Sequence, residues 1–169
     1  MRAGDFIALQ IGRQRWLADS VVQELTDEQL NWSPPGATNT IATILLHVTG
    51  TDDTFINVLA QGQPTVWESG KWSERIGFPG FPGRAGHWDE ANAHSFTLAP
   101  LLEYQAAVRA SVDAYLAALT DEELARTVQA LGSEQPMAAV LGLVVIHEAH
   151  HFGEIAALKG AQGIKGLPF

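Results

Sequence analysis

Three of the six histidines lie within one short run, in which residues 147–151 read His-Glu-Ala-His-His. In a helix, the imidazoles of His147 and His151 project from the same face one turn apart, a spacing that suits two ligands of one metal ion. The same face carries apolar side chains that direct the pair toward a core, namely Val140, Val144 and Leu158. Burying an imidazole in an apolar core costs free energy unless its nitrogens bind a hydrogen-bond partner or a metal ion. The run therefore indicates a metal site, and a pair of hydrogen-bonded core histidines is the alternative.

A metal ion held by protein side chains alone needs at least a third ligand, and His47 is the best candidate. His47 lies in a predicted helix over residues 39–60, beside an apolar stripe and on the side that carries several threonines. An ordinary histidine at the core boundary is the alternative for this position. We expect His87 and His94 to face solvent, and His150 either to support the ligands or to lie on the surface.

The run also matches the His-Glu-x-x-His pattern of zinc metalloproteases, in which the glutamate is the general base. Those enzymes take their third ligand downstream, either after a glycine three residues beyond the second histidine or from a later helix. Here Glu154 occupies the glycine position, and only residues 152–169 remain for another helix. No strand pattern upstream offers a sheet edge for a peptide substrate. These differences disfavour a protease.

The candidate ligands depend on helices to position them, and apolar periodicity predicts four long ones. Their approximate ranges are residues 5–25, 39–60, 97–119 and, after Pro136, a segment to about Lys159. Asn39 and Thr97 are suitable N-caps, and Thr26 and Thr120 begin capping boxes for short helical pieces. We find no run with the period of a strand. The pattern predicts an all-α fold, a helical bundle formed by residues 1–169 as a single domain.

The connection over residues 65–96 has no helical period and is rich in glycine and proline. It also contains several aromatic residues, namely Trp67, Trp72, Phe78, Phe81 and Trp88. A loop of this length in a compact domain is functional or disordered, and the aromatic residues indicate order. Two interpretations remain open: the aromatic residues close one end of the core, or the segment from Trp67 to Trp88 forms a wall of a substrate pocket.

Composition narrows the possible functions. Ten Lys and Arg against nineteen Asp and Glu give a formal net charge of -9, which is the wrong sign for binding nucleic acid or an anionic membrane surface. The absence of Cys excludes disulfides, thiolate ligands, iron–sulfur clusters and a cysteine nucleophile, so any thiol must arrive with a substrate. Neither a signal peptide nor a membrane-spanning run is found, and we expect a cytoplasmic protein.

Three stretches around the histidines form a recognisable set. They are Asn39-Thr40-Ile41 ahead of His47, His147-x-x-x-His151 followed by Gly153-Glu154-Ile155, and the closing Lys159-Gly160-x-x-Gly163-x-x-Gly166-x-Pro168. This set resembles the DinB/YfiT-like metalloenzyme superfamily over nearly the whole chain. The resemblance implies an up-down-down-up four-helix bundle and a homodimer. In this bundle the long irregular, aromatic-rich segment over residues 65–96 connects helices 2 and 3. It also implies a divalent metal, nickel or zinc, bound by His47, His147 and His151 in an otherwise open site.

The resemblance also implies a chemistry, because the superfamily includes isomerases and transferases that use low-molecular-weight thiols. Three neutral ligands leave the ion's charge uncompensated and favour deprotonation of a bound thiol or water, so hydrolysis is a second enzymatic use of the site. Glu148 and Glu154 are the candidate acid or base groups, or else ordinary surface or buried paired residues; the family commonly has Gln at the position of Glu154. A non-catalytic metal-binding stress-response protein is the hypothesis from a different class.

Overall fold

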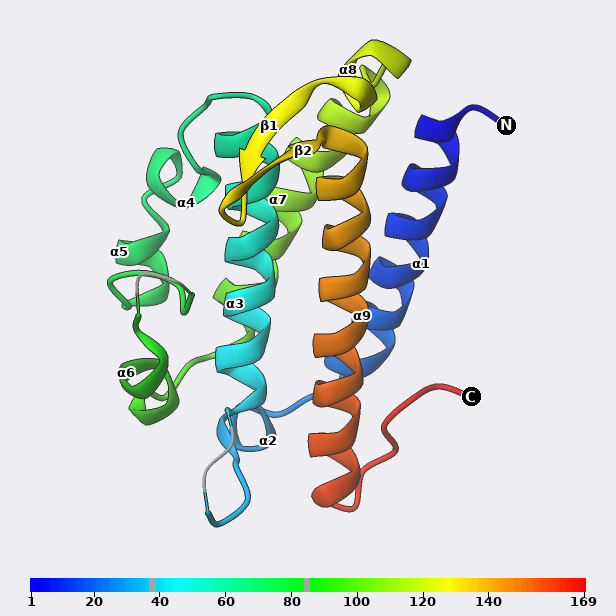
Figure 1. Cartoon of the computed structure of the whole chain (residues 1–169). Coiled ribbons are helices and arrows are strands. Elements are labelled where there is room, and N and C mark those ends of the chain that lie inside the picture. The colour runs from blue at the N-terminus through cyan, green and yellow to red at the C-terminus, as the bar shows by residue number, and fades with distance from the viewer. Residues whose placement is uncertain (37–38, 84–85) are drawn as a thin grey trace.

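Four long helical segments run beside one another in the computed structural model, which describes residues 1–36, 39–83 and 86–169 (Figure 1). They are α1 (Ala3–Val22), α3 (Ile41–Asp53) with its continuation η1 (Thr54–Ala60), α7 (Leu98–Ala117) and α9 (Met137–Ala161). Each corresponds to one predicted helix, with boundaries that differ by a few residues. The helical character expected from apolar periodicity is confirmed.

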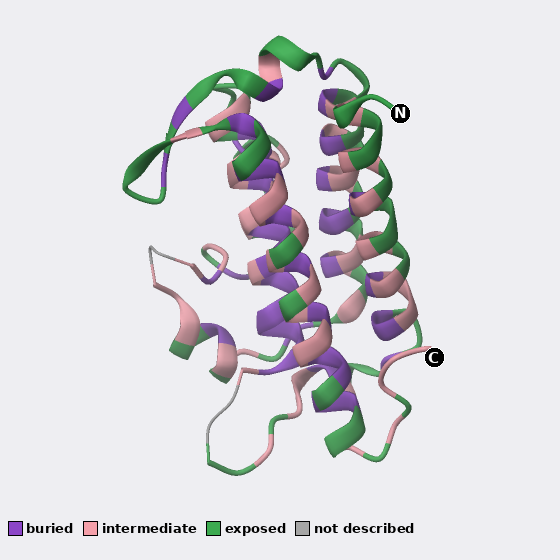
Figure 2. Ribbon diagram, turned by 45° about the vertical axis from the view of Figure 1, so that its right-hand side comes forward, coloured by how far each residue is buried: buried purple, intermediate pink, exposed green. Residues whose placement is uncertain are grey.

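The long helices pack through their apolar faces, α9 against α1 and α3, and α3 against α7. Buried residues follow the inward sides of these helices in Figure 2, as expected where an apolar stripe repeats every three to four residues. The largest fully buried side chains are Tyr104, Phe96, Phe152, Ile11, Leu30, Ile41, Ile44, Leu45, Leu46, Ile56, Leu101 and Met137. Within the described ranges, no helix combines the length and the apolar character needed to cross a membrane.

Helix α3 begins one residue later than predicted. The N-cap is Thr40, whose hydroxyl accepts from the Thr43 N–H at 3.1 Å, whereas Asn39 was the expected cap. Asn39 instead accepts a hydrogen bond from the Asn92 amide, and Asn92 accepts from the Thr40 backbone N–H at 3.0 Å. Because Asn92 belongs to α6 (Trp88–Ala93), these bonds fix α6 to the start of α3.

Beyond Asp53 the predicted second helix continues to Ala60, but as the π-helix η1. The Thr54 hydroxyl donates to the Gly50 carbonyl at 2.8 Å, a back-bond of the kind that bends helices. The carboxylate of the fully buried Asp53 accepts from the N–H groups of Val66 and Trp67 and from the Tyr104 hydroxyl. Asp53 thereby holds α4 (Val66–Ser69) against the long helices.

The connection over residues 65–96 is more regular than predicted, because it contains α4, α5 (Trp72–Ile76) and α6. These helices are too short for an apolar periodicity to be recognised in the sequence. Thr65 caps α4 in a capping box with Glu68, and the rings of Trp67 and Trp72 both pack against Tyr104 of α7. Part of the aromatic segment therefore completes the core.

Two further short helices follow the predicted capping boxes. Helix α2 (Asp27–Asn31) has the full reciprocal pair, in which Thr26 accepts from the Gln29 N–H and Gln29 accepts from the Thr26 N–H. Helix α8 (Asp121–Ala125) has the first of these bonds, from the Glu123 N–H to Thr120. The Glu123 carboxylate instead accepts from the Tyr115 hydroxyl and from Arg126. The helix therefore forms as predicted, but with only one of the two reciprocal hydrogen bonds of a capping box.

The all-α prediction is wrong at one point, since an antiparallel hairpin of β1 (Thr127–Ala130) and β2 (Ser133–Pro136) precedes α9. Each strand has four residues, too few for a convincing alternation, and β2 carries only polar residues and a proline. What closes the hairpin is the two-residue turn of Leu131 and Gly132, whose φ angles are 51° and 88°. A strand search based on apolar period misses such an element.

Candidate metal centre

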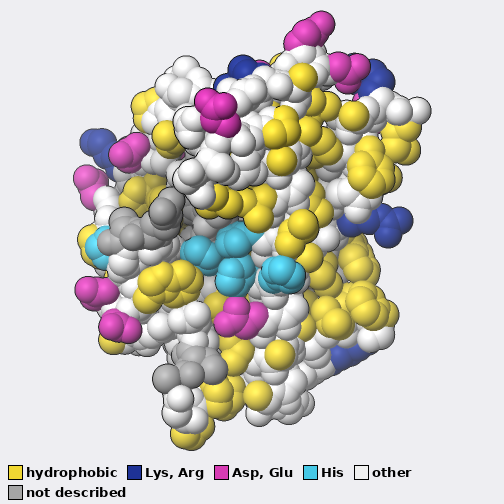
Figure 3. Space-filling model, viewed as in Figure 1, with side chains coloured by type: hydrophobic (Ala, Val, Ile, Leu, Met, Phe, Trp, Pro, Cys, Tyr) yellow, Lys and Arg dark blue, Asp and Glu magenta, His cyan; other side chains and the backbone are white. Residues whose placement is uncertain are grey.

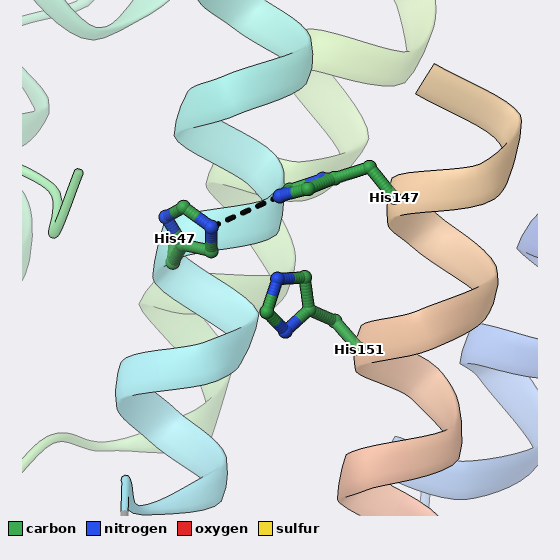
Figure 4. Close-up of side chains that lie close together, drawn as sticks. All are labelled: His47, His147 and His151. Atoms are coloured by element: carbon green, nitrogen blue, oxygen red, sulfur yellow. Dashed lines mark hydrogen bonds between the residues drawn. The ribbon is translucent and has the colours of Figure 1, made fainter. Parts of the chain in front are cut away.

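The structure brings together the three histidines that the sequence singled out. His47 projects from α3, and His147 and His151 project from α9 toward it (Figure 4). Their candidate donor nitrogens all lie within 4.8 Å of one another, and Nε2 of His47 is 3.0 Å from Nε2 of His147. The spacing of four residues within one helix and the packing of α9 on α3 are sufficient to produce this convergence.

His47 is oriented by the segment that precedes α6. Its Nδ1 lies 2.7 Å from the Pro82 carbonyl oxygen, which can only accept, so Nδ1 carries the proton and Nε2 presents a lone pair to the other histidines. The ring of Trp88 packs on the imidazole with a centroid distance of 4.6 Å. Trp88 is fixed in turn, because its Nε1 donates to the Gly83 carbonyl at 3.2 Å.

Gly50, one turn beyond His47 in α3, permits this arrangement. A Cβ atom at this position would lie 2.2 Å from the ring of Phe81, so the ring packs directly on the glycine backbone. Phe81 immediately precedes Pro82 in the chain. The close approach of Phe81 to α3 therefore brings the Pro82 carbonyl to His47.

The two candidate ligands of α9 differ in their surroundings. Nδ1 of His151 is 3.0 Å from a carboxylate oxygen of Glu154, in the next turn of the same helix. Nδ1 of His147 is buried and has no hydrogen-bond partner among the described residues. Glu154 is therefore the carboxylate that directly contacts a histidine of the cluster.

The electrostatics of the cluster favour neutral imidazoles. Burial lowers the pKa of His47. Burial, together with the neighbouring His151 and His47 imidazoles, lowers the pKa of His147 to about 4. Metal ligands must be deprotonated, so this environment keeps the lone pairs available at neutral pH.

The donor set fits a divalent metal ion. Imidazole nitrogen suits zinc and nickel and binds at about 2.0–2.1 Å, so three converging Nε2 atoms can share one ion after small side-chain adjustments. A metal-bound imidazole usually donates its other N–H to a carbonyl or carboxylate. His47 meets this condition through Pro82 and His151 through Glu154.

Glu148 lies elsewhere, although it occupies the general-base position of the protease pattern. It is 4% exposed and lines an interior cavity of about 20 Å³ together with Asp52, Arg15 and Arg109. Burial raises the pKa of Glu148 to about 7, and burial with the adjacent Glu148 carboxyl raises the pKa of Asp52. None of the three histidines lines this cavity. The position of Glu148 offers no support for a protease.

The remaining histidines lie outside the cluster. His150 is exposed on α9. His87 and His94, which were expected to face solvent, are half-buried and pack against Phe78 with ring distances of 6.2 and 5.2 Å. Their aromatic neighbours explain the difference, because Phe78 and Phe96 draw that part of the connection onto the core.

The sequence did not identify the groups that orient the ligands. The Pro82 carbonyl carries no side-chain signal, and Trp88 was predicted only as one of the aromatic residues that either close one end of the core or form a pocket wall. Gly50 was detectable in principle, as a glycine inside a strongly apolar helix.

In Figure 3 the histidines gather on one face and are visible at the surface, so the site is shallow.

Comparison with known proteins gives a consistent result. A family model described as the DinB superfamily matches residues 10–155. A conserved protein from Enterococcus faecalis has a TM-score of 0.80 at 17% identity, over 94% of this chain and 96% of that chain. A DinB-like protein from Bacillus cereus ATCC 10987 has a TM-score of 0.59 at 18% identity, over 95% and 93% of the two chains. At these identities the likeness concerns the fold alone. No curated protein matches the chain.

Proposed function

Since the chain belongs to the DinB superfamily, we propose that it binds one divalent metal ion through His47, His147 and His151 and uses it as a metal-dependent enzyme. The convergence of three imidazole donors within 4.8 Å carries this proposal. Zinc and nickel are the metals that the resemblance favours. The long helices are proposed to form the up-down-down-up four-helix bundle of the family.

The chain's own residues prepare the centre for catalysis. Pro82 and Glu154 set the orientation of His47 and His151, and the ring of Trp88 packs on the imidazole of His47. A bound divalent ion supplies a Lewis acid that lowers the pKa of a thiol or water beside it. Because the three ligands are neutral, the chain adds no negative charge of its own at the donor atoms to weaken this effect.

The composition supports a proposal for the substrate class. The chain contains no Cys, so a thiol that reacts at the centre must belong to a small molecule. We therefore propose a transfer or isomerisation that uses a low-molecular-weight thiol, with hydrolysis by a deprotonated water as the other enzymatic outcome. Glu154, which touches His151, is the nearest candidate to hold a proton during either reaction.

Metal analysis of the purified protein tests the site. We expect about one equivalent of zinc or nickel per chain in the wild type and its loss in His47→Ala, His147→Ala and His151→Ala. The matched control is His150→Ala, which removes an exposed imidazole from the same helix and should retain the metal. Full metal content in all three ligand variants would contradict the assignment.

Measurements of turnover distinguish a metal-dependent enzyme from a non-catalytic metal-binding protein. A screen of several thiols with electrophilic substrates should give activity that chelation abolishes and added metal restores. A non-catalytic metal-binding protein is the second candidate, and the shallow position of the histidines in Figure 3 favours it. That candidate predicts metal-dependent stability without metal-dependent turnover.

A further inference from the structure

Leu143 lies one helical turn before His147 on α9, on the side of the helix that carries the histidine cluster. Residues four apart in a helix lie about 40° apart around the axis, with Cβ atoms about 5–6 Å apart. Helical side chains lean toward the N-terminus of their helix, so the imidazole of His147 lies over the turn that contains Leu143. Figure 3 shows hydrophobic side chains directly above the histidines, toward the start of α9 in Figure 1. The helix geometry therefore places Leu143 at the edge of the centre.

The side chain of Leu143 lies on the open side of the cluster. Around the axis of α9, His151 is displaced from His147 by about 40° in one direction, and Leu143 is displaced by about 40° in the other. The direction of His151 continues to the buried Val144, whereas the direction of Leu143 continues to the exposed His150. A molecule that approaches the cluster from solvent along α9 therefore meets Leu143.

The core does not account for a leucine at this position. Helix α9 packs into the core through other side chains, such as Leu141 and Phe152, which are almost completely buried. Leu143 is only half-buried, and it is not among the partly buried apolar residues that pack against the core within the described ranges. The residues that follow it along this border of α9, at spacings of four, three and four, are His147, His150 and Glu154. An apolar side chain next to convergent polar groups is typical of a small-molecule site.

We propose that Leu143 is an apolar contact for the substrate bound at the histidine centre. The substrate then carries an alkyl or aryl group close to the atom that approaches the metal. This inference rests on the proposed function and extends it by assigning a substrate class. A substrate that is polar throughout would gain no binding free energy from this leucine, because the gain depends on the apolar area removed from water.

A pair of metal-directed ligands tests the contact without knowledge of the natural substrate. The probes are acetohydroxamate and hexanohydroxamate, titrated into cobalt-loaded protein and followed by the cobalt absorption bands. They share the chelating group and differ by four methylenes. Because a shallow site covers only part of the alkyl chain, we expect the wild type to bind the longer probe about tenfold more tightly.

Three variants of Leu143 separate its apolar surface from its size. Leu143→Ala, which shortens the side chain, should reduce the chain-length ratio to about twofold. Leu143→Gln, which keeps the length but not the apolar surface, should reduce it as well. Leu143→Met keeps both and should preserve the ratio. All three should retain the cobalt, since Leu143 is not a ligand, and circular dichroism should show unchanged helical content.

The matched control is Leu9→Ala, the same truncation at an exposed leucine of α1, and it should leave the ratio unchanged. A wild type that takes up no cobalt contradicts the proposed function, and the inference fails with it. A cobalt-loaded wild type that binds both probes equally contradicts the apolar substrate class. Cobalt uptake with a chain-length ratio unchanged by Leu143→Ala and Leu143→Gln contradicts the assignment of Leu143 alone.

Discussion

Glu154 illustrates at the residue scale how a proposed metal ligand depends on its neighbour. Its carboxylate accepts from Nδ1 of His151 at 3.0 Å, which fixes the tautomer that presents Nε2 to the cluster. We expect Glu154→Ala to weaken metal binding about 10–100-fold and Glu154→Gln, which keeps an acceptor, to weaken it less. Competition with a chromophoric chelator measures both affinities. Glu90→Ala, an exposed substitution on α6, is the control, and equal affinities for all four proteins would exclude the orienting role.

Two adjacent aspartates, Asp52 and Asp53, make opposite contributions to the stability of the folded protein. Asp53 accepts four hydrogen bonds, from Val66, Trp67, Tyr104 and Asn57, so Asp53→Asn should destabilise the protein by about 2–4 kcal/mol. Asp52 faces the buried carboxyl of Glu148; burial and this carboxyl raise the pKa of Asp52, so Asp52→Asn removes the cost of keeping a second titratable carboxyl there. That variant should be neutral or up to about 1–2 kcal/mol more stable at pH 8. Urea unfolding at pH 8 compares the two, and equal losses would contradict this account.

At the scale of elements, α3 and the segment before α6 are coupled through a glycine. Gly50→Ala places a methyl group where the Phe81 ring lies, so the segment must move away from α3 and carry the Pro82 carbonyl away from His47. We expect lower metal affinity together with a loss of stability of about 1–3 kcal/mol. Gly142→Ala in α9, where the added Cβ meets open space, should instead stabilise by up to about 1 kcal/mol. Unchanged metal affinity in Gly50→Ala would show that the packing of Phe81 does not position His47.

The helices and the ligand candidates were predictable because both depend on short spacings within one element. The four-residue spacing of His147 and His151, the apolar stripes and the capping box at Thr26 all fall into this class. The groups that orient the candidate ligands could not be predicted, because Pro82 lies 35 residues from His47 and acts through its backbone carbonyl. The hairpin also escaped prediction, because Leu131 occupies a turn position that usually carries asparagine or aspartate.

On the scale of the whole molecule, the interior carries charge that makes stability depend on pH. Burial raises the pKa of Glu148 from its ordinary value of 4.5 to about 7, so the folded protein holds this proton more tightly than the unfolded chain. The stabilisation is complete below about pH 4.5 and is lost as pH rises through about 7. Glu148→Gln cannot lose a proton. The stability of the metal-free wild type relative to this variant should therefore fall on the order of 2–3 kcal/mol between those pH values.

Chemical unfolding of both proteins across that range measures the difference. The lowered pKa of His147 acts in the opposite direction, but it is common to both proteins and largely cancels in the comparison. A difference that stays constant with pH would show that the pKa of Glu148 is the same in the folded and the unfolded protein. Such a result would require the nearby guanidinium groups of Arg15 and Arg109 to offset both buried carboxylates.

The outer surface of α1 supports the homodimer that the family resemblance implies. Phe6, Leu9 and Trp16 are each about half exposed and lie on the side of α1 away from the core, and Ile146 is exposed on the neighbouring α9. A stable interface buries about 800 Å² on each partner and has apolar and aromatic anchors at its centre. We therefore expect a dimer at micromolar concentration, measured by light scattering. The double variant Leu9→Glu and Trp16→Glu should be monomeric with its helical content unchanged.

Leu131→Asn provides the matched control for that experiment. It also replaces an exposed leucine by a polar residue, but on the hairpin instead of α1, and it should remain dimeric. The pair of variants distinguishes a specific interface from general adhesion between exposed apolar side chains, because adhesion would weaken in both. A wild type that is monomeric at micromolar concentration would contradict the dimer outright. A dimer that persists in the double variant would place the interface on a face other than that of α1.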